Sequence, residues 1–495
     1  MTTVLDMTGL ELLRTTLARV LGEDAVSDEP TWLVGGVVRD ALLGRPLPDV
    51  DLATAGDPGT VARRLGAAVG GAVFQLGERH GCWRVVVGDA QQERRDPSTV
   101  PEALRVVEQF DVCALRGATI GEDLAARDFT ANALAVQLVG EGMVLDRSTG
   151  MHDLEAGTLR MVAATAFDDD PLRMLRAARI AHVLNWDLDP ATADAIRTRA
   201  ARAVEPAGER TFAELELLLL HPEARRGWRL LDQLGLDRML LPELDRCRGM
   251  VQSRFHHLDV HDHTLAVLDN CEDLLGATEF WLPLPDDLAP VAQPWTRQQR
   301  LTVLLAALCH DLGKPDTHRV RDDGRISFVG HDDAGLPIVD AIAARWKWSA
   351  RQREDVRRLV GTHLALGFLL HSERAPRDRW RFLRSVEPVA AEAVVLSVGD
   401  RLATAGPDDR RRWVRAHLEL ARTVWADHWR EQRDGHPVPL LDGLELAEAA
   451  GIRPGPRVGE LVRALAEAQA VGDVRDREAA IALVRQLSES TVQQP

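Results

Sequence analysis

The segment from residue 31 to residue 53 constrains the fold more than any other part of the chain. A short apolar strand is expected at residues 31–34 and runs directly into Gly35-Gly36. A helix is expected over 37–43, and after a proline turn a second strand covers 49–53. The free N–H groups of a helix N-terminus favour phosphate, and glycine lets the phosphate approach the backbone. The order of these elements predicts a mixed α/β unit with an anion site.

The second expected strand carries two carboxylates, Asp49 and Asp51. Strand residues two apart share a face and lie about 6.6 Å apart along the chain. Two unpaired carboxylates on one face are costly unless a cation lies between them, and oxygen ligands suit Mg²⁺ that also binds a substrate phosphate. The alternative is a pair of exposed turn aspartates after Pro48. The spacing alone leaves both interpretations open.

The string Leu33-Val34-Gly35-Gly36-Val37-Val38-Arg39-Asp40 is followed thirteen residues after Gly36 by the Asp-x-Asp strand. This arrangement resembles the head of the tRNA nucleotidyltransferase and bacterial poly(A) polymerase family, class II of the polymerase-β-like nucleotidyltransferases. The family pattern is LVGGxVRD followed by DxD. The resemblance implies that Gly35, Gly36 and Arg39 cradle a triphosphate, and that the two aspartates are catalytic and hold Mg²⁺.

A second segment, Arg127-Asp128-Phe129-Thr130-Ala131-Asn132, resembles the family's RRDFTxN element. The resemblance implies that Arg127, Asp128 and Asn132 contact the sugar and the triphosphate. Ala126 stands where the family has its first arginine, so that phosphate contact is either missing or supplied elsewhere. Asp111 is a candidate third catalytic carboxylate, and the alternative is a surface residue on an edge strand.

The segment Asp168 to Arg179 resembles the family's EDxxR element, with Asp169 in place of Glu. The resemblance implies a nucleotide-binding set formed by Asp169, Asp170, Arg173, Arg176 and Arg179. Residues at i and i+3 of a helix share a face. Asp170 and Arg173 are therefore expected to read one base edge, the amine and ring-nitrogen pattern that cytosine and adenine share. The alternative is an acidic first turn followed by a solvated arginine face.

Downstream, His310-Asp311 is the one His-Asp pair that follows an apolar helix and precedes Leu-Gly-Lys. This segment resembles the core of HD-domain phosphohydrolases. Histidine nitrogens and carboxylates from several helices can hold one or two divalent metals with positions open to water. The expected metal ligands are His263, His310, Asp311 and Asp400. His331 and His363 are candidate ligands for a second metal. His256, His257 and His261 compete for the place of the first ligand.

Composition limits the class of protein. The 495 residues are 45% hydrophobic and 27% charged, as in soluble globular proteins. No window offers the 18 apolar residues of a membrane helix, and the N-terminus is unlike a signal peptide. The five cysteines are scattered without a CxxC motif. We therefore expect no disulfide framework and no thiolate zinc site, and the reducing cytoplasm is the expected location.

The net charge is −16, but residues 345–384 hold eleven Lys and Arg against four Asp and Glu. This basic region and the helical body are expected to follow the phosphates of a tRNA acceptor arm. The expected fold is α+β, with a mixed α/β nucleotidyltransferase head followed by helical domains. The expected domains are the head (1–150), a helical body for nucleotide selection and RNA binding (151–250), an HD domain (251–405) and a helical tail (406–495).

The resemblance predicts a CCA-type tRNA nucleotidyltransferase that uses Mg²⁺, CTP and ATP and has a fused HD domain of phosphohydrolase type, without a membrane partner. A bacterial poly(A) polymerase is the first alternative. The stretch after Asp51 offers only Arg63-Arg64 and lacks the longer basic segment typical of those enzymes. From another class, the chain could be an HD phosphohydrolase whose head only binds nucleotide. The intact Asp49 and Asp51 argue against that alternative.

Overall fold

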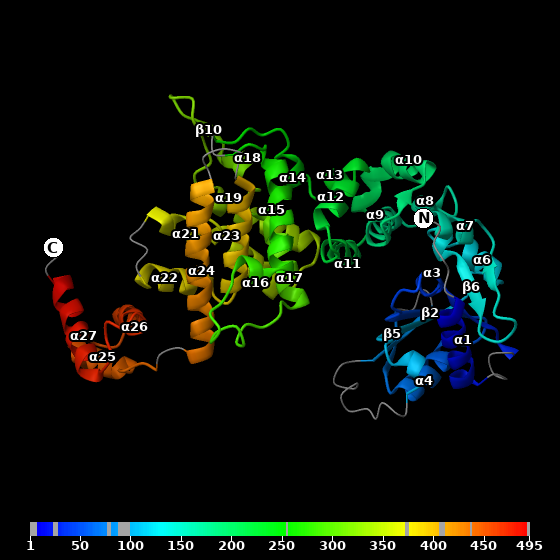
Figure 1. Cartoon of the computed structure of the whole chain (residues 1–495), viewed down its shortest axis with the longest axis horizontal. Coiled ribbons are helices and arrows are strands. Elements are labelled where there is room, and N and C mark those ends of the chain that lie inside the picture. The colour runs from blue at the N-terminus through cyan, green and yellow to red at the C-terminus, as the bar shows by residue number, and fades with distance from the viewer. Residues whose placement is uncertain are drawn as a thin grey trace. The chain divides into compact units, whose positions relative to one another are not determined.

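The structure is a computed structural model, and it describes residues 7–22, 28–76, 81–87, 100–253, 256–371, 376–404, 411–435 and 438–492. The chain divides into two compact units. The first comprises Met1–Glu214 and Leu230–Met239, and the second comprises Leu215–Arg229 and Leu240–Pro495. Figure 1 shows a mixed sheet in the N-terminal part and helices through the rest of the chain, so the predicted α+β class is confirmed.

The head is built on one seven-stranded sheet with the order β3-β4-β5-β2-β1-β6-β7. Its strands are β1 (Thr31–Val34), β2 (Asp49–Thr54), β3 (Ala72–Gln75), β4 (Trp83–Val86), β5 (Gln109–Ala114), β6 (Leu134–Gln137) and β7 (Val144–Asp146). The pairing of β2 with β5 is parallel, and the other pairs are antiparallel. The strands expected at 31–34 and 49–53 are present.

The two faces of this sheet differ in how much apolar surface they bury. Helices α1 (Met7–Leu21), α3 (Gly36–Leu42) and α4 (Pro58–Val69) contribute to a large core that includes Leu33, Leu52 and Phe110. The opposite face carries a much smaller cluster, to which Val34 and Ala53 belong. Asp49 and Asp51 alternate with buried residues of β2, as the sequence predicted, and share the face of Ala53. That face therefore leaves room for a polar site.

After the head, the chain is mostly helical. The first helices are α9 (Leu172–Leu184), α10 (Pro190–Arg199), α11 (Gly208–Leu219) and α12 (Ala224–Gln233). The second unit contains α15 (Val260–Gly276), α17 (Arg297–Cys309), α19 (His331–Arg345), α20 (Ala350–Thr362), α22 (Pro376–Val386), α23 (Ala390–Thr404) and α24 (Arg411–Asp434). Helices α15, α17 and α23 pack against one another in its centre (Figure 1). The last helices, α25 (Gly443–Ala450), α26 (Pro456–Ala470) and α27 (Arg477–Val492), share a separate core.

The expectation about cysteines needs a correction. Cys82 and Cys113 are joined by a disulfide, while three others are buried and free. The antiparallel register that pairs Trp83 with Val112 puts the two cysteines opposite each other, with Cα atoms 4.1 Å apart. They are 31 residues apart in sequence, so only the register of the sheet reveals the pair. Within the described residues, no helix is long and apolar enough to cross a bilayer.

The sheet core makes a testable prediction. Phe110 lies at the centre of the sheet and is fully buried, whereas Phe74 on β3 is 44% exposed. Phe110→Ala should destabilise the head by about 3–5 kcal/mol, because the ring leaves a cavity that its neighbours cannot fill. Phe74→Ala is the matched control and should cost far less. Calorimetric unfolding of the whole chain measures both, and equal losses would contradict this account of the core.

Candidate nucleotide site and metal centre

The turn between β1 and α3 brings the backbone close to two charged side chains. Gly35 has φ 78°, in the left-handed region that favours glycine, and its N–H donates to the carbonyl of Leu134. A Cβ at this position would lie 2.7 Å from Nη1 of Arg127 and 3.4 Å from Oδ2 of Asp51. A glycine is therefore required where the predicted phosphate turn meets the predicted metal-binding aspartate.

The parallel register of β2 and β5 pairs Asp51 with Asp111. Strand β5 lies between β2 and β4, so Asp111 is not on an edge strand. Burial and the Asp111 carboxylate raise the pKa of Asp51 to about 6, against the opposing charge of Arg127. Burial and Asp111 also raise the pKa of Asp49. Carboxylates whose ionised forms are disfavoured in this way fit a divalent cation with oxygen ligands.

Unlike the carboxylates of β2, the carboxylate of Asp128 is stabilised in its ionised form. Its oxygens accept from the Phe129 N–H at 2.9 Å, from Asn132 Nδ2 at 3.0 Å and from Arg176 Nε at 3.0 Å. Although burial alone would raise it, the charge of Arg176 and the hydrogen bond from Asn132 lower the pKa of Asp128 to about 2. Arg39 donates to Asn132 Oδ1 at 2.6 Å and so fixes the orientation of the Asn132 amide. The Asp128–Asn132 pair is rigid before any ligand binds.

The structure corrects the expectation that Asp170 and Arg173 share a helix. Asp170 is extended between α8 (Ala166–Asp169) and α9, because the proline that follows it disfavours helical backbone. Its carboxylate accepts from the Leu172 N–H at 3.1 Å and from Arg210 at 2.6 Å. Nη1 and Nη2 of Arg173 donate to backbone carbonyls of Ala126, Arg127 and Ala166.

These groups surround one cavity of about 530 Å³. The sequence-predicted residues that line it are Gly35, Gly36, Asp51, Asp111, Arg127, Asp128, Asn132, Asp170, Arg173 and Arg176. Four other predicted residues do not line the cavity. Arg39 and Arg179 donate hydrogen bonds to the lining residues Asn132 and Glu214. Asp49, at the start of β2, and Asp169 are exposed. Four charged lining residues were not predicted from the sequence: Arg116, Asp123, Arg210 and Glu214. Arg84, which binds both oxygens of Asp111 at 2.7–2.8 Å, was not predicted either.

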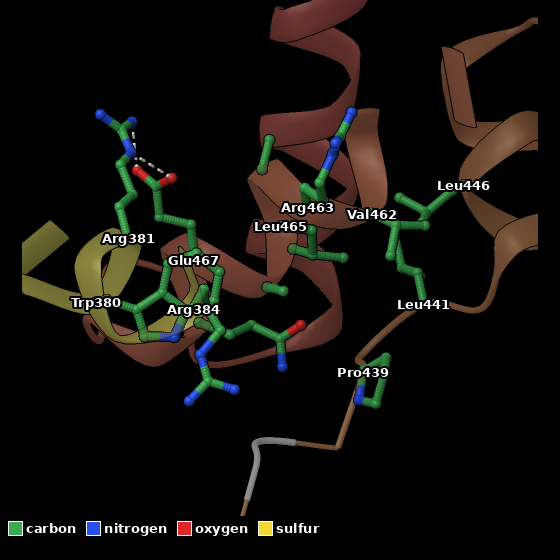
Figure 2. Close-up of a pocket in the computed structure, with 13 residues that line it drawn as sticks. Trp380, Arg381, Arg384, Pro439, Leu441, Leu446, Val462, Arg463, Leu465 and Glu467 are labelled. Atoms are coloured by element: carbon green, nitrogen blue, oxygen red, sulfur yellow. Dashed lines mark hydrogen bonds and ion pairs between the residues drawn. The ribbon is translucent and has the colours of Figure 1, made fainter. Parts of the chain in front are cut away.

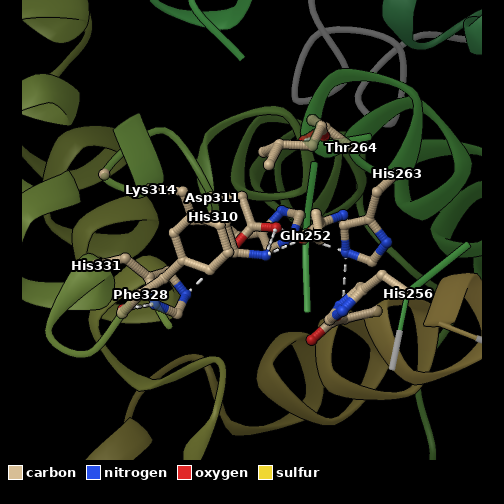
Figure 3. A network of polar contacts seen from close by, with 12 residues as sticks. Gln252, His256, His263, Thr264, His310, Asp311, Lys314, Phe328 and His331 are labelled. Atoms are coloured by element: carbon tan, nitrogen blue, oxygen red, sulfur yellow. Dashed lines mark hydrogen bonds and ion pairs between the residues drawn. The ribbon is translucent and has the colours of Figure 1, made fainter. Parts of the chain in front are cut away.

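The second unit gathers all six predicted metal ligands of the HD domain. Figure 3 shows four of them, His263, His310, Asp311 and His331. Two groups of three have ligand atoms within 4.8 Å of one another: His263, His310 and Asp400, and Asp311, His331 and His363. Asp311 lies between them, with Oδ2 at 3.1 Å from His310 Nε2 and Oδ1 at 3.3 Å from His331 Nε2. The arrangement has the ligands for one or two divalent ions.

The hydrogen bonds of the histidines fit a metal. Nδ1 of His310, His331 and His363 lies 2.7–2.9 Å from the carbonyl three residues earlier in the chain. An Nδ1–H donated in this way leaves Nε2 with its lone pair, which is the form that binds a metal. Within the part of the chain that the structure describes, the buried Nε2 atoms of His263 and His310 make no hydrogen bond, although each lies 3.1 Å from a carboxylate oxygen.

The competing histidines are separated by the fold. His257 is exposed, and His261 lies beside Asp262 in a different acidic group. The ring of His256 lies 5.0 Å from that of His263, next to the cluster (Figure 3). Lys314 donates to Asp311 at 2.6 Å and to Gln252 at 2.7 Å. The loop before α15 therefore supplies neighbours of the cluster that sequence spacing could not identify.

Together, the fold and the two sites define a polymerase-β-like nucleotidyltransferase fused to an HD domain. The chain matches the family description "Poly A polymerase head domain" over residues 31–160. It also matches "Probable RNA and SrmB- binding site of polymerase A" over 185–248 and "HD domain" over 260–405.

The A-adding tRNA nucleotidyltransferase of Deinococcus radiodurans is 36% identical over 471 residues, covering 93% of this chain and 96% of that protein. The CC-adding enzyme of Thermus thermophilus is 34% identical, covering 91% and 92%. The chain thus belongs to the tRNA nucleotidyltransferase family. A solved Bacillus stearothermophilus CCA-adding enzyme in complex with CTP has the same fold, with 22% identity and a TM-score of 0.60 over 97% of this chain and 99% of that one.

The raised pKa of Asp51 leads to a testable prediction. The pKa of Asp51 in the folded state lies above its ordinary value of 3.8, so the ionised form costs stability. That cost builds up as the pH rises from the ordinary pKa to about 6 and stays constant above it. In magnesium-free buffer, Asp51→Asn should raise the melting temperature at about pH 8 and change it little at about pH 4. Added Mg²⁺ should stabilise the wild type and not the variant. The exposed Asp194→Asn is the control, and a destabilised Asp51→Asn protein at the higher pH would refute the argument.

Proposed function

We propose that the head transfers nucleotides from CTP and ATP to the 3′ end of tRNA. The observation that supports this most directly is the pairing of Asp51 with Asp111, beside the Gly35 turn and above the Asp128–Asn132 pair. The related A-adding and CC-adding enzymes support the substrate class. The proposal covers addition of C, of A, or of both.

In the reaction, the tRNA 3′ hydroxyl attacks the α-phosphorus, a new phosphodiester forms, and the bond to pyrophosphate breaks. Asp49 and Asp51, with Asp111, would hold Mg²⁺, which lowers the pKa of the hydroxyl and neutralises phosphoryl charge when it is bound. The turn at Gly35 and Gly36 and the Arg127 guanidinium would orient the triphosphate. Asp128 and Asn132 would receive the ribose.

We keep Asp170 and Arg173 as the proposed readers of the base, because both line the cavity although they come from different elements. Asp170 reaches the cavity together with Arg210, and Arg173 is fixed by three carbonyls. A carboxylate and a guanidinium held in place can distinguish cytosine and adenine from uracil and guanine. An unmatched base would leave buried polar groups unpaired, at about 1–3 kcal/mol per group.

The basic region 345–384 offers less free charge than its sequence suggests. Each of its nine described arginines has an acidic partner, as Arg381 has in Glu467 (Figure 2). Lys347 has no partner among the described residues. Contact of this region with tRNA phosphates would compete with those ion pairs, so we propose the helical body, residues 151–250, as the main RNA contact. A cytoplasmic location is part of the same proposal.

Incorporation assays test the proposed transfer. With tRNA lacking its 3′ end and tRNA ending in CC, the wild type should incorporate label from CTP, ATP or both. Asp49→Ala and Asp51→Ala should lower incorporation by several orders of magnitude, because the carboxylates that hold the metal are lost. Asp194→Ala, an exposed aspartate of the same unit, is the control. Near-normal incorporation by either variant would refute the metal assignment, and A-tailing of RNA other than tRNA would favour a poly(A) polymerase.

We further propose that the HD domain is a metal-dependent phosphohydrolase. The inward-facing Nε2 atoms and the central Asp311 support it, because such a set can hold a metal and activate water for attack on phosphorus. The metal would be a transition metal of the kind that imidazole ligands prefer, unlike the ion in the head, which has oxygen ligands only. The substrate would be a phosphate ester, as expected for RNA ends or nucleotides.

Substitutions in the cluster should separate the two activities. His310→Ala and Asp311→Asn should lose bound transition metal and hydrolysis of a generic phosphate ester, while nucleotide addition is retained. The exposed His257→Ala is the matched control. Metal analysis of the purified whole chain, with nucleotide incorporation as the folding check, gives the answer. Unchanged metal content in both variants would refute the ligand assignment.

A further inference from the structure

The nucleotide cavity contains arginines and acids in similar numbers, but they do not all pair. Within the lining, Arg127 pairs with Asp123 at 2.9 Å and Arg210 with Asp170 at 2.6 Å, and Arg176 pairs with both Asp128 at 3.0 Å and Glu214 at 3.1 Å. Arg84, which does not line the cavity, binds Asp111 at 2.7 Å. After these pairs, two lining cations have no carboxylate within hydrogen-bonding distance among the described residues, Arg116 and Arg173. Among the same residues, Asp51 is left without a cationic partner. The cavity thus contains an unpaired carboxylate, which favours a cation, and two arginines without a carboxylate partner, which favour an anion.

The position of Arg116 is defined by two contacts. It follows β5 and precedes α6 (Ile120–Ala125), and its Nη1 donates to the carbonyl of Ala126 at 3.3 Å. Its nearest carboxylate oxygen, on Asp123, is 4.0 Å from Nε. That carboxylate is already bound by Arg127 and by the Arg116 N–H. The Arg116 side chain is 51% exposed, so its guanidinium is accessible from the cavity.

Arg116 and Arg173 approach each other with like charge. Nη2 of Arg173 donates to the same Ala126 carbonyl at 2.9 Å, so two guanidinium groups share one acceptor. Two cations held together in a partly enclosed space without an anion are unfavourable, and the cost is removed when an anion binds between them.

We propose that Arg116 is a triphosphate ligand and supplies the phosphate contact that is absent at position 126. Its guanidinium donates to the backbone carbonyl of Ala126 and lines the same cavity as Arg127. A guanidinium is a planar, permanently charged fork that suits phosphate oxygens. This inference rests on the proposed nucleotidyl transfer for its substrate, and it assigns Arg116 a role toward the phosphates alone. CTP and ATP carry the same triphosphate, so both depend on Arg116 equally.

The test separates phosphate binding from chemistry. Calorimetric titration of the whole chain with inorganic tripolyphosphate measures the contact directly. Arg116→Ala should weaken binding about 10- to 100-fold, the equivalent of one hydrogen bond between charged groups. The KM values for CTP and ATP should rise by similar factors. Arg63→Ala, in α4 and outside the lining of the cavity, is the matched control and should change neither quantity.

A compensating substitution makes the test sharper. In the double variant Arg116→Ala with Ala126→Arg, tripolyphosphate affinity should recover most of the loss, because the arginine of the family pattern is restored next to Arg127. Arg116→Gln replaces Arg116→Ala if the alanine variant does not fold. Unchanged tripolyphosphate affinity in the folded Arg116 variant, or a KM change confined to one nucleotide, would overturn the inference. A wild type that binds tripolyphosphate through Arg116 but adds no nucleotide to tRNA would refute the proposed function and leave this inference intact.

Discussion

The parallel pairing of β2 with β5 determines the nucleotide site. It puts Asp51 opposite Asp111 on the sheet face with the smaller apolar core, next to the turn at Gly35. The carboxylates repel each other there, and Arg84 neutralises only Asp111. In the same cavity, Arg116 and Arg173 share one carbonyl. A magnesium-bound nucleoside triphosphate would supply both a cation for the carboxylates and an anion for the two arginines.

The HD cluster is organised by a different device. The C-caps of α17 and α20 are His310 and His363, and His331 is the first residue of α19. Each ring is oriented by a carbonyl three residues earlier in the chain. The orientation is therefore local, set by the backbone of the same turn. The packing of α15, α17 and α23 brings ligands from different helices together, because it places His263 and Asp400 next to His310. Local geometry selects the ligand nitrogen, and tertiary packing selects the set.

The strands at 31–34 and 49–53 and the α+β class followed from apolar runs and glycine punctuation, which are local signals. Asp111 was found as a candidate, but its partner Asp51 depends on a register that no local pattern contains. The disulfide between Cys82 and Cys113 and the salt bridge of Arg84 depend on the register of β4 with β5. For Asp170, in contrast, a local signal was present in the sequence. The proline after Asp170 predicts an extended backbone there, whereas the i, i+3 spacing assumed that Asp170 and Arg173 lie on one helix.

Charge is where sequence and structure differ most. Residues 345–384 are strongly basic as a string, yet partners such as Glu243, Asp427 and Glu467 come from distant segments and neutralise the arginines in pairs. The nucleotide cavity is nearly balanced in composition, yet its pairing leaves Arg116 and Arg173 without a hydrogen-bonded carboxylate and Asp51 without a cation among the described residues. A surface ion pair of this kind contributes little to stability, but it removes a charge from recognition. The charges that recognise a ligand are those left over after pairing, and only the three-dimensional arrangement shows which they are.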